Sequence, residues 1–280
     1  MTSPDPVSSP SPSAPSSPLA APEPWNLVAE GYVAENLPSF EAFAREALRL
    51  VPATGDVLDV AAGPGSLTLQ AARTARQVHA VDFASAMLEQ LNARAAAAGV
   101  SNVVAQAADG QALPFADQSF DAAYSMFGLI FFPDRARGLR EMRRVLRPGG
   151  RALIASWPPF VRIPAFAALF DAMKAELPGS GIGDAPPALG TAAEIQAELG
   201  AAGFRNIDVH EHTVVPGVVT PTELWRTFSR GGAPAVLMRR RMGEDAFASF
   251  SERIIKRLID RLGPEPREMQ MVALLGIGTR

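Results

Sequence analysis

Three aspartates end or follow short apolar runs, where their carboxylates can bind a ligand. Asp59 lies near the end of the first run, Asp82 directly follows the second, and Asp109 comes shortly after the third. Two glycines, Gly63 and Gly65, stand in the loop after Asp59. Glycine lacks a Cβ and adopts conformations that other residues avoid, so this loop can turn tightly and approach a bound molecule closely.

The spacing of the first two acids is typical of a nucleotide-type site. Asp82 stands 82 − 59 = 23 residues after Asp59, and an acid at this place in an open parallel sheet accepts hydrogen bonds from ribose hydroxyls. A structural alternative is that Asp82 or Ser85 caps the following helix. Helix capping alone does not explain why an aspartate stands at the end of each of three predicted strands. The arrangement therefore predicts a cofactor with a ribose.

The glycine loop distinguishes between cofactors. A dinucleotide site needs a third glycine three residues after the second, and Thr68 occupies that place. A phosphate-binding Walker loop needs a lysine, but the only lysines are Lys174 and Lys256. S-adenosylmethionine has a ribose and an adenine but no phosphate, and it therefore fits a loop with two glycines and no cation.

The hydrophobic pattern predicts the elements that must position these residues. A helix capped by Ser39 comes first. The expected strands are 56–60, 77–81, 103–106, 120–126 and 152–157, and the helices between them are 66–75, 84–98 and 134–146. Strands separated by helices of this length predict a parallel sheet with helices on both faces.

After residue 157 the regular alternation of predicted strands and helices ends. A helix is expected at 163–177, and Thr191 and Thr220 each begin a capping box, the second with Pro221 at the first helical position. Two further helices and strands at 207–215 and 269–278 complete the chain. The total is a seven-stranded sheet with one reversed strand.

Composition excludes several classes of protein. The 280 residues include no cysteine, which excludes disulfides, thiolate metal sites and a cysteine nucleophile. The formal net charge of −3 provides no strong field for nucleic acid. Residues 1–24 contain eight prolines and seven serines and are expected to be a disordered tail. With neither a signal peptide nor an apolar run of membrane length, we expect a cytoplasmic protein.

Four ordered blocks resemble class I S-adenosylmethionine-dependent methyltransferases, and within them the ubiquinone/menaquinone biosynthesis methyltransferase-like group. The blocks are VLDVAAGPGS (57–66), VHAVDFASAML (78–88), AADGQALPFADQSFDAAYSMFGL (107–129) and REMRRVLRPGGRALIASW (140–157). The resemblance implies a Rossmann-like α/β domain over residues 25–280. Its sheet would be mostly parallel with one antiparallel strand, and lid elements would lie at about 25–38, 158–190 and 221–262.

The resemblance also implies roles for individual residues. The main chain around Ala61 would face the methionine part of the cofactor, Asp82 the ribose, and Asp109 the adenine amino group. Tyr32, which precedes the fold, is expected to close over the cofactor. The full predicted set is Tyr32, Asp59, Ala61, Gly63, Gly65, Asp82, Phe83, Met87, Ala108, Asp109, Gly110, Gln111, Ser125 and Met126. The family usually has glycine at the place of Ala61, and we expect alanine to be tolerated there.

The acceptor of the methyl group is expected to be a small apolar or aromatic metabolite, with O-methylation favoured over C- or N-methylation. The apolar segment 127–132 follows the fourth strand, and Trp25, Phe127 and Phe131 are the candidate pocket residues. Methyl transfer by in-line displacement depends mainly on alignment, so no catalytic residue is assigned.

Other acceptors and a metal are disfavoured. Ser125-Met126-Phe127-Gly128 stands where amine methylation of bases needs an Asn/Asp-Pro-Pro-aromatic run, and cytosine C5 methylation needs a cysteine. Asp121 begins the fourth strand instead of ending it, so no metal is expected. The basic run 239–241 is interpreted as a solvated helix face, and His79, His210 and His212 are not expected to act in catalysis.

Two alternatives stay open on the sequence. A binding or regulatory protein would keep the cofactor fold without methyl transfer. A nicotinamide-dependent oxidoreductase would bind NAD, although Thr68 opposes this.

Overall fold

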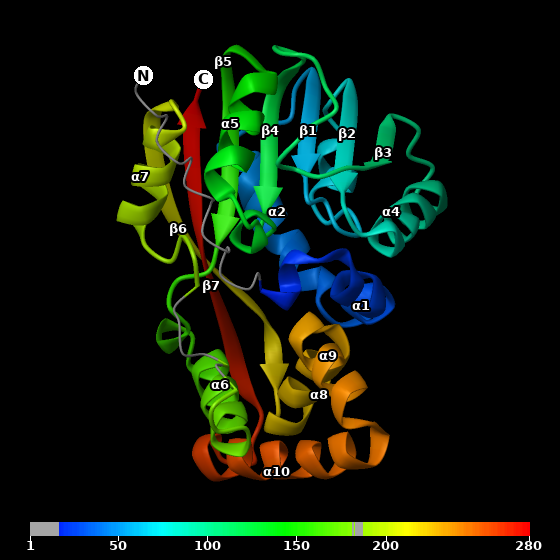
Figure 1. Ribbon diagram of the computed structural model, residues 1–280, viewed down its shortest axis with the longest axis vertical. Coiled ribbons are helices and arrows are strands. Elements are labelled where there is room, and N and C mark those ends of the chain that lie inside the picture. The colour runs from blue at the N-terminus through cyan, green and yellow to red at the C-terminus, as the bar shows by residue number, and fades with distance from the viewer. Residues whose placement is uncertain (1–16, 181, 183–186) are drawn as a thin grey trace, which may run out of the picture.

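A seven-stranded sheet forms the centre of the computed structural model, which describes residues 17–180, 182 and 187–280. The strands lie in the order β3-β2-β1-β4-β5-β7-β6 (Figure 1). Their bounds are β1 Asp56–Val60, β2 Gln77–Asp82, β3 Val103–Ala107, β4 Phe120–Met126, β5 Leu146–Ser156, β6 Arg205–Val219 and β7 Arg267–Thr279. Strands β1 to β5 pair in parallel, and β7 is antiparallel to both β5 and β6. The prediction of seven strands with one reversed is confirmed.

Helices cover both faces of the sheet because the strands alternate in what they present to each side. Val57 packs with α2 and α3 on one face, whereas Leu58 packs with α5 on the other. The helices are α1 Pro22–Glu35, α2 Leu37–Leu50, α3 Thr68–Ala71, α4 Ser85–Ala97, α5 Arg135–Val145, α6 Pro164–Glu176, α7 Ala192–Ala201, α8 Pro221–Gly231, α9 Ala233–Met242 and α10 Glu244–Leu262. Short 3₁₀ turns are η1 Pro18–Ala20, η2 Leu129–Phe131 and η3 Phe160–Arg162.

A helical subdomain, made of α6, α8, α9 and α10, lies beyond one end of the sheet (Figure 1). Strands β6 and β7 extend past the other strands into it, and they pair from Arg205 to Val219. Its core has Leu169 of α6, Trp225 of α8 and Phe250 of α10. The two predicted capping boxes, at Thr191 and Thr220, begin α7 and α8.

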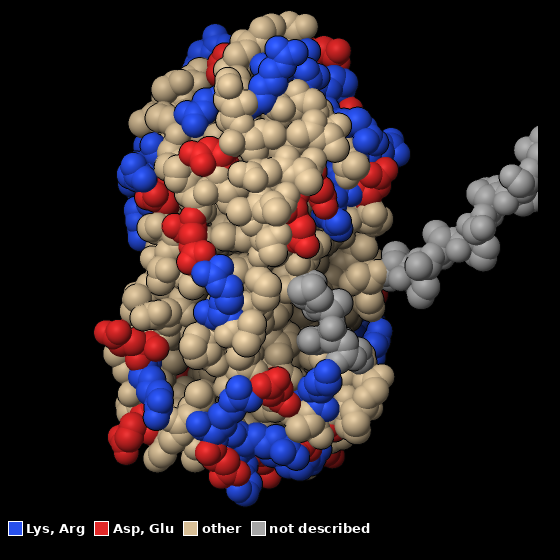
Figure 2. All heavy atoms as spheres, turned by 90° about the vertical axis from the view of Figure 1, so that its left-hand side faces the viewer, with Lys and Arg blue, Asp and Glu red and all other residues tan. Residues whose placement is uncertain are grey.

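Charged side chains of both signs are interspersed on the face shown in Figure 2. In the helical subdomain, Glu176 of α6 pairs with Arg253 and Arg257 of α10 at 2.6 and 2.5 Å. Within the described residues no helix has both the length and the apolar character needed to cross a bilayer.

Several boundaries differ from the prediction for local reasons. Helix α2 begins at Leu37 instead of after Ser39, because Pro38 is accommodated in its first turn. The predicted helix 66–75 is helical only at Thr68–Ala71. Strand β5 begins at Leu146, six residues early, because its Pro-Gly-Gly segment is an irregularity inside the strand and not its beginning.

The expected disordered tail is shorter than predicted. Residues 18–20 form η1, and α1 begins at Pro22 with proline in its first turn, which is a favourable place for proline. The indole Nε1 of Trp25 donates a hydrogen bond of 2.9 Å to the Leu19 carbonyl, and Leu19 packs against the apolar side of α1. Residues 1–16 lie outside the described residues.

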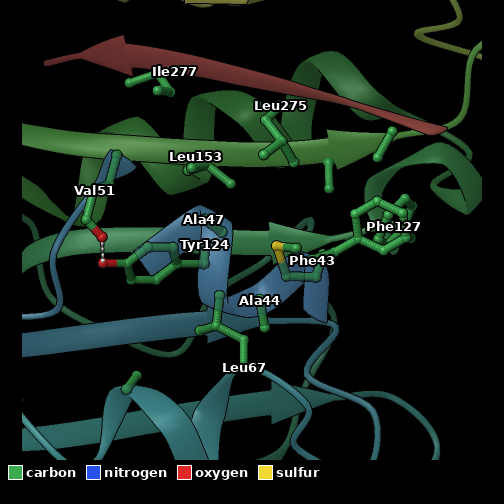
Figure 3. Close-up of a cluster of buried hydrophobic side chains, with 14 of the residues drawn as sticks. Phe43, Ala44, Ala47, Val51, Leu67, Tyr124, Phe127, Leu153, Leu275 and Ile277 are labelled. Atoms are coloured by element: carbon green, nitrogen blue, oxygen red, sulfur yellow. Dashed lines mark hydrogen bonds between the residues drawn. The ribbon is translucent and has the colours of Figure 1, made fainter. Parts of the chain in front are cut away.

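Tyr124 joins β4 to the loop that leads into β1. Its side chain is fully buried, and its hydroxyl donates a hydrogen bond of 2.8 Å to the Val51 carbonyl (Figure 3). Phe43 and Ala47 of α2 pack in the same cluster. A buried hydroxyl needs such a partner, because burying it unpaired costs free energy.

Removing only this hydroxyl should therefore destabilise the protein. We expect Tyr124→Phe to lower the free energy of unfolding by about 1–2 kcal/mol, because the Val51 carbonyl loses its donor inside the core. Urea unfolding followed by circular dichroism measures this difference. A Tyr124→Phe variant as stable as the wild type would contradict the assignment.

Candidate functional site

The loops that carry the predicted site residues meet at one edge of the sheet. Because β1 to β4 are parallel, their carboxyl ends lie at this edge, and Val60 pairs with Val81 in register. Hydrogen bonds join the neighbouring loops. The Gly63 N–H donates a hydrogen bond of 2.8 Å to Asp82 Oδ2, and the Ala108 N–H donates one of 3.1 Å to the Asp82 carbonyl. Gly63, Asp82 and Ala108 therefore lie together at the carboxyl ends of the strands.

Asp82 is buried and held by main-chain donors. It is 5% exposed, and the N–H groups of Gly63 and Ala84 donate to its two oxygens at 2.8 and 2.9 Å. Burial raises the pKa of Asp82 to about 6, although these N–H groups favour the charged form and oppose the rise. Neither Asp82 nor Ser85 caps α4, whose N-cap residue is Ala84 and makes no side-chain cap hydrogen bond. Each Asp82 oxygen can still accept from a ligand.

Open space lies beside Gly63. A Cβ placed on Gly63 would meet no atom within 4 Å, and its φ of +55° is one that residues with side chains rarely adopt. The N–H of the same residue donates a hydrogen bond to the Asp82 carboxylate. A main chain without side-chain cover, next to a buried acid, suits a ligand that carries hydroxyl groups.

Asp59 faces away from this space, toward α3. The Thr68 hydroxyl donates to Asp59 Oδ2 at 2.6 Å, which explains why threonine occupies the place of a third glycine. Burial raises the pKa of Asp59 to about 7, despite the Thr68 hydrogen bond, and the nearby Asp82 charge adds to the rise. Among the described residues, Asp59 Oδ1 and Ser125 Oγ are the buried side-chain polar atoms without a hydrogen-bond partner.

Ala61 is strained, and Gly128 accommodates it. Ala61 has a φ of 56°, in the left-handed region that costs L-residues about 1–2 kcal/mol. A Cβ on Gly128 would lie 2.3 Å from the Ala61 Cβ. The Ala61 methyl group therefore has room in the folded chain, because the facing position in the loop after β4 has no side chain.

The loop after β3 is braced against the start of α5. Asp109 Oδ1 accepts from the Gln111 N–H at 2.8 Å, and Gln111 Oε1 accepts from the Asp134 N–H at 2.8 Å. Gly110 is required here, because a Cβ on it would lie 2.4 Å from the Phe132 ring. Asp109 itself is exposed and can accept from a ligand.

Helix α1 covers the site with both residues that the sequence singled out. The Trp25 and Phe131 rings meet edge-on with centroids 4.8 Å apart, and Tyr32 lies 5.2 Å from Phe40. Burial and the Asp82 charge both raise the pKa of the Tyr32 hydroxyl. Sequence reasoning missed Asn26, whose Oδ1 accepts from the Ala86 N–H at 3.0 Å and so caps α4 from α1.

The remaining predicted residues divide by burial. Met87 is buried against α1, and Ser125 and Met126 are buried at the end of β4. Phe83 is 38% exposed, so its side chain is available to pack on a ligand at the surface of the loop. Gly65 has a φ of +83°, and a Cβ placed on it would lie 3.0 Å from the Leu91 side chain.

The acceptor side is aromatic, but Phe127 belongs mainly to the core. Its ring stacks on Trp157 with centroids 4.2 Å apart and contacts Phe40 and Phe43 edge-on. Phe127 is 5% exposed, whereas Phe40 and Phe131 are half-buried. Sequence reasoning missed Trp157 and Phe40, because nothing in their local spacing indicates that β5 and α2 meet beside β4.

The three histidines lie in different surroundings, and the His212 ring packs edge-on against Phe43 with centroids 6.2 Å apart. His79 stands between the Phe115 and Phe120 rings, at 5.4 Å from each, and lines a cavity of about 480 Å³ with Asp56 at the start of β1. His210 pairs with Asp208 of the same strand. No group of three possible metal-binding side chains occurs within the described ranges.

Comparison with known proteins gives a consistent result. A family model described as a methyltransferase domain matches residues 57–150. The ubiquinone/menaquinone biosynthesis C-methyltransferase of Geotalea daltonii is 34% identical over 202 residues, which cover 65% of this chain and 83% of that protein. An uncharacterised protein of Mycobacterium tuberculosis is 45% identical over 101 residues, 36% of each chain. This chain therefore spans about a third of the first curated relatives that it matches.

A solved structure shows the same fold. The YcgJ protein from Bacillus subtilis has a TM-score of 0.57 and 22% identity, and the match covers 86% of this chain and 97% of that one.

The contact between Ala61 and Gly128 can be tested by a double-mutant cycle. We expect Gly128→Ala to lower the free energy of unfolding by about 1–3 kcal/mol, because its new methyl group overlaps that of Ala61. The variant Ala61→Gly combined with Gly128→Ala should recover much of this loss, with Ala61→Gly alone as the reference. Urea unfolding of the four proteins measures the coupling, and a double variant no more stable than Gly128→Ala would contradict it.

The raised pKa of Asp59 makes stability depend on pH. The folded pKa of about 7 lies above that of an unfolded aspartate, so the stabilisation is present below about pH 4 and is lost as pH rises through 7. Asp59→Asn removes this titration. From pH 4 to pH 8, the free energy of unfolding of the variant should therefore rise by up to about 4 kcal/mol relative to that of the wild type. Urea unfolding across that pH range measures this difference. Parallel curves for the two proteins would show that Asp59 titrates normally.

Proposed function

The chain belongs to the class I S-adenosylmethionine-dependent methyltransferases, and on this premise we propose that it methylates a small apolar or aromatic metabolite. The observation that carries the proposal is the buried Asp82 carboxylate at the carboxyl end of β2, which the N–H groups of Gly63 and Ala84 hold in place while each oxygen can still accept from a ligand. The residues fit the cofactor, because its ribose offers hydroxyl donors to Asp82 and its adenine offers an amino donor to Asp109. Neither contact requires a cation from the protein.

When bound, S-adenosylmethionine supplies an electrophilic methyl group that an acceptor atom takes by in-line displacement, with S-adenosylhomocysteine as the product. The contribution of the chain is to bind the cofactor and the acceptor and to align them. Asp82 and Asp109 hold the two ends of the nucleoside, and Tyr32 and Trp25 on α1 shield the site. No general base is assigned, and the proton of a hydroxyl acceptor passes to solvent.

The half-buried aromatic rings beside the site support an apolar acceptor. Phe40 and Phe131 each present part of a ring, and apolar concave surfaces with few polar groups are typical of small-molecule sites. O-methylation is the form that the sequence favours, whereas the Geotalea daltonii relative is named a C-methyltransferase. Incubation with radiolabelled S-adenosylmethionine and a panel of phenols and quinols, followed by mass spectrometry of the products, distinguishes the two. Cofactor binding without transfer to any acceptor would favour the regulatory alternative.

Asp82 should control cofactor affinity. We expect Asp82→Asn to weaken S-adenosylhomocysteine binding by about 1–3 kcal/mol at pH 7.5, because charged hydrogen bonds to the ribose are lost. With a pKa of about 6, ionised Asp82 accumulates above pH 6, so wild-type affinity should rise from pH 5 to 7 while the variant stays nearly constant.

Calorimetry at several pH values measures both effects. Asp117→Asn is the matched control, because Asp117 is exposed and pairs with Arg144 away from the site. Equal affinity of Asp82→Asn and the wild type would remove the central support of the proposed function.

A further inference from the structure

Helix α1 lies between the cofactor site and the helical subdomain (Figure 1). Its first half faces the site: Trp25 contacts Phe131, Asn26 caps α4, and Val28 packs with Ala84 and Met87 just after Asp82. Its last turn faces α8 instead. Because α1 contacts both the site and α8, a shift of α8 can move the part of α1 that covers the cofactor site.

The contact between α1 and α8 is polar and partly buried, since Glu35 is nearly enclosed while the Arg230 side chain is 56% exposed. Glu35, whose side chain is 11% exposed, accepts from the Thr227 hydroxyl at 3.3 Å and pairs with Arg230 at 3.2 Å. Asn36 directly follows α1, and its Nδ2 donates a hydrogen bond of 2.7 Å to the Gly231 carbonyl at the end of α8. These hydrogen bonds need donors and acceptors in fixed places, so they define one position of α1 on α8.

The main chain of α1 at Gly31 also lies close against that of α8, and Gly231 lies close against the Asn36 side chain. A Cβ on Gly31 would lie 2.0 Å from the Arg230 carbonyl oxygen, and a Cβ on Gly231 would lie 2.6 Å from Asn36 Nδ2. Side chains at either glycine would push the helices apart. We call the contacts of Glu35 and Asn36 with Thr227, Arg230 and Gly231 the α1–α8 latch.

The exposed pair of Glu23 and Arg240 offers a contrast. It joins α1 to α9 at 2.6 Å, but the two side chains are 62% and 60% exposed. Exposed ion pairs of this kind contribute about 0–1 kcal/mol. The latch and this surface pair therefore lie on the same helix but differ in burial, which makes the pair a matched control.

We propose that Glu35 and Asn36 are positioning residues that hold α1 closed over bound cofactor by fastening it to α8. The inference rests on the proposed function, since it assigns the site under α1 to S-adenosylmethionine. Neither residue touches that site directly. Their effect is on how long the nucleoside stays bound, because α1 must move away from Met87 and Phe131 before it can leave.

The test is the dissociation rate of S-adenosylhomocysteine, measured by stopped-flow tryptophan fluorescence after a chase. Asn36→Asp keeps the shape of the side chain but places an oxygen opposite the Gly231 carbonyl, and Thr227→Val removes the hydroxyl that reaches Glu35. We expect both variants to release the nucleoside about tenfold faster, the change that the loss of one buried hydrogen bond produces. Glu23→Gln should match the wild type.

A second measurement separates positioning from general loss of folding. Hydrogen exchange in α1 should speed up in Asn36→Asp without ligand and return toward wild-type protection with saturating S-adenosylhomocysteine, while the amides of β1 and β4 stay unchanged. Release rates within twofold of the wild type in both latch variants, or an equal increase in Glu23→Gln, would overturn the proposal. A wild-type protein that does not bind the nucleoside would instead overturn the proposed function.

Discussion

Burial of the Asp82 carboxylate is the constraint around which the site is built. A buried carboxylate without donors carries a large free-energy penalty, and here the donors are main-chain N–H groups of Gly63 and Ala84. The loop after β1 must therefore bend toward the end of β2. This bend requires left-handed conformations at Ala61 and Gly63, and the methyl group of Ala61 in turn requires a glycine at position 128.

Much of this arrangement follows from local sequence. The strands β1 to β4 were predicted within one residue at each end, because short apolar runs bounded by glycine, proline or aspartate leave few alternatives. Asp82, Gly63 and the loop after β3 were placed together, since parallel strands end at a common edge. Both capping boxes were recognised, because Thr191 and Thr220 each have glutamate three residues later.

The parts that were missed depend on contacts between distant segments. Asn26 caps a helix that begins about sixty residues later in the chain, and no local pattern marks it. Local sequence marks Thr68 only as the absence of a third glycine, whereas its hydroxyl donates a hydrogen bond to the buried Asp59. Prolines near residue 20 suggested disorder, yet they stand in first turns, where their fixed φ favours a helix. The placement of Trp157 and Phe40 beside Phe127 needed the three-dimensional packing of β5, α2 and β4.

The sheet order carries a consequence for how the protein assembles. Strand β6 is joined to the rest of the sheet only through β7, which follows it by about fifty residues in the sequence. During synthesis, β6 thus leaves the ribosome without a partner, and its pairing must wait until β7 inserts beside β5. Contacts between such distant segments form late and slowly, and an unpaired strand is prone to aggregation meanwhile. The sheet can therefore be completed only after the last strand of the chain has been synthesised.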